Sequence, residues 1–137
     1  MFFKLTGVAV KKTLIMCLSI GLFGFFGSLC RYGVARLLGR YSAFFPWGTL
    51  LINITGSFFL GWFLTWAHSR LQISDVIRSG IAIGFVGAYT TFSTYMFESD
   101  RMLAAGEVAR GILYIAGSVA LGLIAVRLGV ILGQRTS

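Results

Sequence analysis

The sequence has little charge and almost no proline. Of its 137 residues only 12% are charged, four are acidic and one is proline. A water-soluble domain of this length carries about twice that share of charged residues, so the composition excludes an ordinary soluble globular protein. Hydrophobic residues make up 57% of the chain, and 18 glycines are present. Because glycine is frequent where membrane helices pack closely, we predict an integral membrane protein.

The few cysteines and acidic residues exclude several kinds of site. Cys17 and Cys30, the two cysteines, fall in one apolar run and form neither a disulfide framework nor a CxxC metal site. No Asp or Glu lies deep in an apolar run, and the one histidine, His68, lies in a link. Neither a nucleophile–base pair nor a phosphate-binding loop is recognisable, so we predict that the protein is not an enzyme.

The net charge of +8 raises the question of a nucleic-acid partner. Lys and Arg stand mostly in the gaps between apolar runs, where they are interpreted as anchors to lipid headgroups. We therefore expect membrane lipid and no nucleic acid as a partner. Arg31 is the exception, since it lies inside the first run. It either reaches back to the headgroups or lines a vestibule for anions.

Four apolar runs approach the length of about twenty residues that crosses a bilayer as a helix. They span 13–38, 44–67, 78–97 and 111–132. Within lipid each backbone amide must be paired inside its own segment, so helices are expected. We predict an all-α integral membrane protein with four transmembrane helices, forming a single domain over residues 1–137 with an N-terminal extension, 1–12. The first run resembles a signal sequence, but we favour a retained anchor.

The distribution of cations and small residues bears on assembly. One side of the membrane would hold Lys4, Lys11, Lys12, Arg70, Arg78, Arg127 and Arg135, and the other Arg36, Arg40, Arg101 and Arg110. Seven against four is a weak bias, so the chain could insert either way up and form an antiparallel pair. Small residues recur at helical spacing in all four runs, which favours packing against a second copy; the alternative is packing within one chain.

The third run ends in an unusual stretch, VGAYTTFSTYMFE, at residues 86–98. Gly87 relaxes a helix, and the hydroxyls that follow compete for its backbone hydrogen bonds, so we predict a break in this helix. These hydroxyls belong to Thr90, Thr91, Ser93 and Thr94. Broken backbone at membrane depth persists only where it is buried or lines a cavity. Its free carbonyls suit Na⁺ and its free amides suit anions; an intact helix with back-bonded hydroxyls is the alternative.

Other polar and aromatic side chains share helical faces. Thr49, Asn53 and Ser57 follow one another at i, i+4 and i+8, and either bind an anion or join neighbouring helices. Tyr114 and Ser118 form a similar pair in the fourth run. Phe92 and Tyr95 lie three residues apart, so their positive ring edges could meet an anion, although they could equally face lipid or fill the core. These features favour a small dimeric pore or carrier for an anion.

Three stretches carry a family resemblance. GSLCRY at 27–32, FPWGTLLINITGSFFLG at 45–61 and GFVGAYTTFSTYMFE at 84–98 resemble the CrcB/Fluc fluoride channels. The similarity covers all four apolar runs in order and spacing. It implies an antiparallel, dual-topology homodimer in the inner membrane, with two pores through which fluoride leaves the cytoplasm passively.

The resemblance also implies roles for individual residues. A structural Na⁺ at the dimer centre would bind backbone carbonyls at positions that match Gly87 and Thr90. The fluoride path would be lined by Asn53, Phe92, Tyr95, Thr94, Tyr114 and Ser118, with Arg31 at the vestibule. Tyr95 departs from the family, which has phenylalanine there, and Gly122 stands where some members have serine. Glu98 matches a carboxylate of the third helix, to which no role is assigned.

Two other classes remain as alternatives. A small multidrug exporter shares four helices and dual topology, but it needs a carboxylate in its first helix, and this chain has none there. A structural or assembly subunit of a membrane complex would show no transport.

Overall fold

The computed structural model describes residues 7–42, 44–69 and 73–136, and within these ranges no strand occurs. Three helical stretches of the described chain are long and apolar enough to cross a membrane: Ala9–Tyr41, Trp47–Ser69 and Val108–Arg135. They correspond to helix α1 (Gly7–Leu38) with the 3₁₀ turn Gly39–Tyr41, helix α2 (Trp47–Ser69) and helix α6 (Val108–Arg135). The prediction of an all-helical chain with apolar spans is confirmed.

The third apolar run forms an interrupted segment. It consists of α3 (Asp75–Ser79), a π-helical stretch (Gly80–Val86), α4 (Gly87–Tyr89) and, after a break, α5 (Phe92–Ala104). Thr90 and Thr91 at the break have extended backbone, with ψ angles of 158° and 107°. The predicted break is therefore confirmed, and it lies at the threonine pair. Gly87 itself keeps helical angles. No sequence pattern predicted the π-helical stretch, a rare conformation found often at functional sites.

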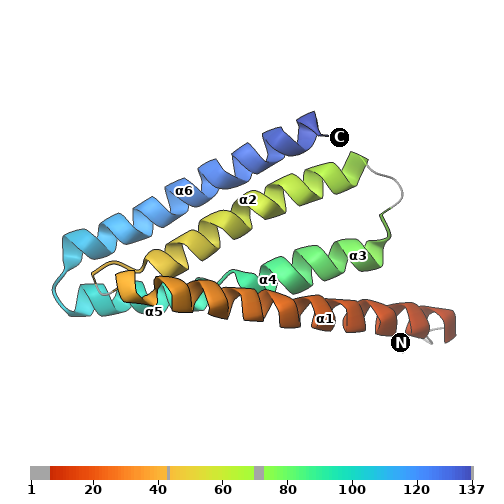
Figure 1. Ribbon diagram of the computed structural model, residues 1–137, viewed down its shortest axis with the longest axis horizontal. Helices are drawn as coiled ribbons and strands as arrows, with labels where there is room; N and C mark the ends of the chain where they lie inside the picture. The colour runs from red at the N-terminus through yellow and green to blue at the C-terminus, as the bar shows by residue number, and fades with distance from the viewer. Residues whose placement is uncertain (1–6, 43, 70–72, 137) are drawn as a thin grey trace, which may run out of the picture.

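The segment changes its packing partner at this break (Figure 1). Before it, the π-helical stretch and α4 pack along α1; after it, α5 packs against α6. Helices α2 and α6 lie side by side over most of their lengths. The break therefore lies where the α1 half of the molecule meets the α2–α6 half, and side chains from several helices can converge on it.

Glycines allow these helix pairs to approach closely within one chain. A Cβ on Gly84 would overlap backbone of α1 at Ile20, at 3.1 Å from its Cα, and one on Gly61 would reach the backbone of Val126 in α6. Part of the small-residue pattern thus serves packing inside the protomer, as the alternative interpretation had it. Gly21 and Gly87 are different, because an added Cβ there would meet no atom within 4 Å.

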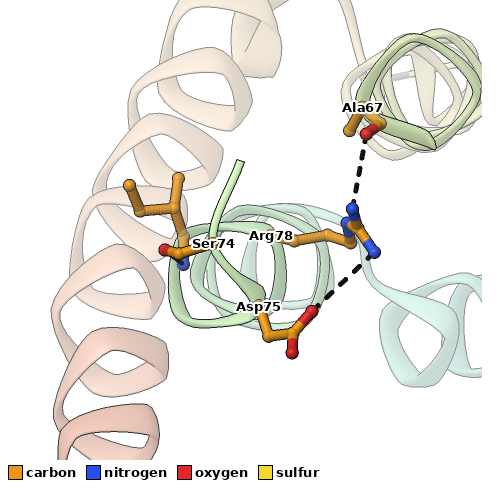
Figure 2. A network of polar contacts seen from close by, with 5 residues as sticks. Ala67, Ser74, Asp75 and Arg78 are labelled. Carbon is orange, nitrogen blue, oxygen red and sulfur yellow. Dashed lines mark hydrogen bonds and ion pairs between the residues drawn. The ribbon is translucent and has the colours of Figure 1, made fainter. Parts of the chain in front are cut away.

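Two further features concern the start of α1 and the contacts of α3. Helix α1 begins at Gly7, so residues 7–12 of the predicted extension continue the helix; residues 1–6, with Lys4, and Arg70 lie outside the described residues. At the start of α3, the Ser74 hydroxyl accepts from the Ile77 amide. Figure 2 shows Arg78 reaching from α3 to the Ala67 carbonyl oxygen at 3.3 Å and to Asp75 at 3.9 Å. A cation at the carboxyl end of α2 favours that helix terminus.

Candidate functional site

The break is closed by a side chain from another helix. Asn53 of α2 accepts from the Thr91 amide through Oδ1 at 2.8 Å and donates from Nδ2 to the Thr91 carbonyl oxygen at 3.1 Å. The Thr91 side chain caps α5, since its Oγ1 accepts from the Thr94 amide at 3.3 Å. The Thr90 hydroxyl donates back to the Val86 carbonyl at 2.9 Å. Asn53 is therefore a joint between helices, and one of its two amide hydrogens has a partner while the second remains for a ligand.

These bonds divert two amides from helical pairing. In a continuous helix the Thr91 amide would donate to the Gly87 carbonyl and the Thr94 amide to the Thr90 carbonyl. Here they donate to Asn53 Oδ1 and Thr91 Oγ1 instead. The carbonyl oxygens of Gly87 and Thr90, the two positions predicted for Na⁺, thereby lose their i+4 donors. Both residues are at least partly exposed.

An open groove beside the break collects four of the predicted pore residues. This break groove has a volume of about 310 Å³. Its lining includes Asn53, Thr90, Phe92, Tyr95, Ser118 and Gly122. The Ser118 Oγ is buried and makes no hydrogen bond to the described part of the chain. A buried hydroxyl without a partner is uncommon, so the groove contains a donor available to a bound anion.

The two aromatic residues below the break have different environments. The Phe92 side chain is 73% exposed, whereas Tyr95 is 6% exposed, and their ring centroids lie 6.0 Å apart. The Tyr95 hydroxyl donates to the Ile115 carbonyl oxygen of α6 at 2.9 Å. The extra hydroxyl of Tyr95 is thus bound within the protein, while the ring lines the groove as a phenylalanine would.

A carboxylate that the sequence left without a role connects three helices. Glu98 of α5 accepts the Thr49 hydroxyl at 2.9 Å and the Tyr114 hydroxyl at 2.8 Å, one on each oxygen. Thr49 and Tyr114 are buried, and the Tyr114 ring meets the Tyr95 ring edge-to-face at 5.2 Å. Only the spacing could have indicated this cluster: Glu98 lies one turn after Tyr95, and Thr49 one turn before Asn53.

The region that contains these residues is similar to known proteins. A sequence profile described as "CrcB-like protein, Camphor Resistance (CrcB)" matches residues 18–130, which include the break, the groove and the Glu98 cluster. The chain belongs to the CrcB family. Several relatives bear the name "Fluoride-specific ion channel FluC". The one from Acidobacterium capsulatum is 41% identical over 85% of this chain and 94% of its own length.

Two further CrcB relatives with that name cover similar lengths. The protein from Synechococcus sp. is 37% identical over 91% of this chain and 97% of its own. The protein from Chlorobium chlorochromatii is 42% identical over 83% of this chain and 88% of its own. The similarity therefore covers most of the chain.

Two residues predicted for the CrcB site stand apart from the groove. Arg31 lies partly exposed on α1 and does not line the break groove. The Thr94 side chain is exposed on α5, where its Oγ1 accepts from the Thr91 hydroxyl at 2.8 Å. Tyr114 does not line the groove, but its ring packs against that of Tyr95, which does. The protomer thus brings together Asn53, Phe92, Tyr95 and Ser118, and leaves Arg31 and Thr94 at its surface.

Proposed function

We propose that this protein is a fluoride-selective channel through which fluoride crosses the membrane passively. The observation that carries the proposal is the break groove, in which the unpartnered Ser118 hydroxyl and the Asn53 amide stand beside two aromatic rings. Fluoride is proposed as the ion because CrcB relatives of this chain are named fluoride-specific ion channels. A passive channel performs no covalent chemistry, which agrees with the prediction that the protein is not an enzyme.

The groove suits a small anion because it offers donors and no carboxylate. Fluoride is strongly hydrated, so a pore must replace its water with fixed hydrogen-bond donors along a narrow path. Asn53 has one amide hydrogen left for this purpose, and Ser118 has its hydroxyl. The ring edges of Phe92 and Tyr95 carry partial positive charge. None of the lining residues is acidic.

The functional unit in this proposal is an antiparallel homodimer with two pores. The groove is open on one side, and Phe92 is 73% exposed, so the single protomer leaves the path incomplete. Exposed apolar side chains of α1, such as Leu18, Leu22 and Leu29, offer further surface for lipid or for the second copy. The third segment would then be a fourth, interrupted crossing of the inner membrane.

A structural Na⁺ at the centre of this dimer fits the residues present. Carbonyl oxygens of broken membrane helices are the usual protein ligands for this ion. The Gly87 and Thr90 carbonyls have lost their helical donors, and nothing lies within 4 Å of a Cβ placed on Gly87, which leaves room for a partner there. When bound, Na⁺ would supply positive potential near the groove. The direction of flow is export, because fluoride that enters as the neutral acid is trapped inside as the ion.

Fluoride efflux from liposomes that contain this chain alone tests the proposal. The liposomes are loaded with fluoride, no proton gradient is imposed, and an electrode records fluoride outside after a K⁺ ionophore compensates the charge. We expect release of fluoride and no comparable release of chloride. Liposomes that release no fluoride, or a drug flux that depends on pH, would contradict the channel proposal. The drug flux would point to the multidrug exporter, and the absence of any transport to an assembly subunit.

A further inference from the structure

A second hollow lies at the turn between α5 and α6. Its volume is about 320 Å³, and we call it the mouth hollow. Its polar lining consists of Ser42, Glu98, Arg101, Glu107 and Arg110, with Phe44 among the apolar residues. Figure 1 shows that the link from α1 to α2 and the α5–α6 turn occupy the same end of the molecule. The mouth hollow is therefore separate from the break groove and lies at one end of the helices.

Arg110 provides a donor in the wall of this hollow. Its guanidinium pairs with Glu107 and lies over the Phe44 ring, 4.6 Å from the centroid. These contacts fix the side chain, yet its Nε is buried and has no hydrogen-bond partner in the described chain. Burying a charged donor without a partner is costly, so a bound acceptor at this position would be stabilising.

Arg101 adds a charge that the protein does not neutralise. It is exposed on α5, one turn after Glu98, and no carboxylate of the described residues lies within 4.0 Å of it. Both oxygens of Glu98 already accept hydroxyls. Glu107 is paired with Arg110, so Arg101 is the charge of the hollow's lining that no carboxylate of the described residues offsets within 4.0 Å.

Contacts connect the mouth hollow to the break groove. Glu98 lines the hollow and accepts from Tyr114 at 2.8 Å. The Tyr114 ring meets Tyr95 at 5.2 Å, and Tyr95 lines the groove. An anion in the hollow would thus be connected to the groove through Glu98, Tyr114 and Tyr95.

We propose that the mouth hollow binds a small inorganic anion through Arg101 and Arg110 Nε. This inference rests on the proposed function only in naming fluoride as the anion that passes on to the groove. In that role Arg101 attracts the ion by charge, and Arg110 replaces part of its water. Exposed charges act in this way mainly at low ionic strength, since salt screens them over about 10 Å at 0.1 M.

A chemical probe of charge tests the hollow without measuring transport. Cys17 and Cys30 are replaced by serine, and Ala105, an exposed residue of the hollow, is replaced by cysteine. The purified protein then reacts with methanethiosulfonates that carry either a sulfonate or a trimethylammonium group. The rate of each reagent is divided by its rate with a free thiol in solution. On this scale we expect the sulfonate reagent to react about threefold to tenfold faster than the cationic one. Fluoride should slow the reaction, compared with gluconate at equal ionic strength.

Variants assign the effect to the two arginines. Arg101→Gln and Arg110→Gln should each remove most of the preference for the sulfonate reagent. Arg40→Gln is the matched control, because it removes the same charge from the turn Gly39–Tyr41, outside the hollow's lining. Since Arg110→Gln also loses the pair with Glu107, the exposed Arg101→Gln provides the variant least disturbing to folding. A preference for the cationic reagent, or equal effects of Arg40→Gln and Arg101→Gln, would overturn the proposal.

Efflux then separates this proposal from the channel itself. In liposomes Arg101→Gln should reduce fluoride efflux about threefold to tenfold at low salt, and the difference should vanish near 0.5 M salt. If the unaltered protein releases no fluoride while the reagent preference persists, the channel proposal fails and the anion site stands. If fluoride passes normally but Arg101→Gln changes neither efflux nor reagent preference, the channel stands and the site fails.

Discussion

Asn53 and Thr91 bind each other through both ends of the Asn53 amide, at 2.8 and 3.1 Å, although 38 positions separate them in the sequence. The pairing supplies both backbone groups of Thr91 with partners at the point where its helix is interrupted. An interruption in lipid would otherwise leave an amide and a carbonyl unpaired, at a cost of several kcal/mol each. Asn53 thus combines a structural role with a place in the lining of the groove.

Asn53→Asp should impair both stability and conduction. A carboxylate accepts the Thr91 amide as before but cannot donate to the Thr91 carbonyl, which costs about 1–3 kcal/mol for an unsatisfied buried group. It also places a negative charge in the groove, so fluoride efflux should fall by at least about tenfold. Thermal unfolding in detergent and efflux from liposomes measure the two effects.

Ser57→Ala is the comparison for Asn53→Asp. Ser57 also lines the groove, one turn further along α2, and makes no hydrogen bond to the break. It should leave the melting temperature nearly unchanged. Normal efflux by Asn53→Asp would remove Asn53 from the fluoride path, whereas its structural role at Thr91 would be judged from the loss of stability alone.

Tyr95→Phe should destabilise the protein slightly and leave conduction within about twofold. The tyrosine hydroxyl donates to the Ile115 carbonyl oxygen, so its loss removes one hydrogen bond between α5 and α6, worth about 0.5–1.5 kcal/mol. The ring, which lines the groove, remains. The free energy of unfolding and the efflux rate test the two halves of this prediction. A large change in efflux would show that the hydroxyl takes part in conduction.

Tyr114→Phe should have the larger effect, although it removes the same atom. Its hydroxyl donates to Glu98, and the side chain is 1% exposed, so the carboxylate loses one of its two donors in a buried position. Hydrogen bonds to charged groups are worth about 1.5–3 kcal/mol. Thr49→Val removes the other donor and should cost a similar amount. Both variants keep side-chain volume, so denaturant unfolding compares them directly. Losses no larger than for Tyr95→Phe would contradict the larger cost assigned to the Glu98 hydrogen bonds.

The sequence predicts local features of this fold better than it predicts contacts. The apolar runs identify the spans because burial in lipid constrains each helix separately, and the hydroxyls after Gly87 predict the break because they act on neighbouring backbone. The Glu98 cluster joins Thr49, Tyr114 and Glu98 from three helices, and no local pattern specifies such a meeting. Gly61 and Gly84 show the same limit: their spacing predicts close packing, but it does not say whether the partner is the same chain or a second copy.

Gly122→Ser should add a donor to the break groove without disturbing the helices. A Cβ at Gly122 would meet only the Ser57 hydroxyl, at 3.9 Å, so the side chain fits, and serine is a better helix former than glycine. One more hydroxyl beside Ser118 should strengthen fluoride binding by about 0.5–1.5 kcal/mol and lower the half-saturating fluoride concentration of efflux by about twofold to tenfold. Gly129→Ser is the matched control on the same helix, where the new Cβ would overlap the Phe58 carbonyl oxygen and approach the Trp62 nitrogen at 2.8 Å. That variant should separate α6 from α2 and cost about 1–3 kcal/mol or more. If Gly122→Ser folded normally and left the concentration dependence of efflux unchanged, fluoride would not pass between Asn53 and Ser118.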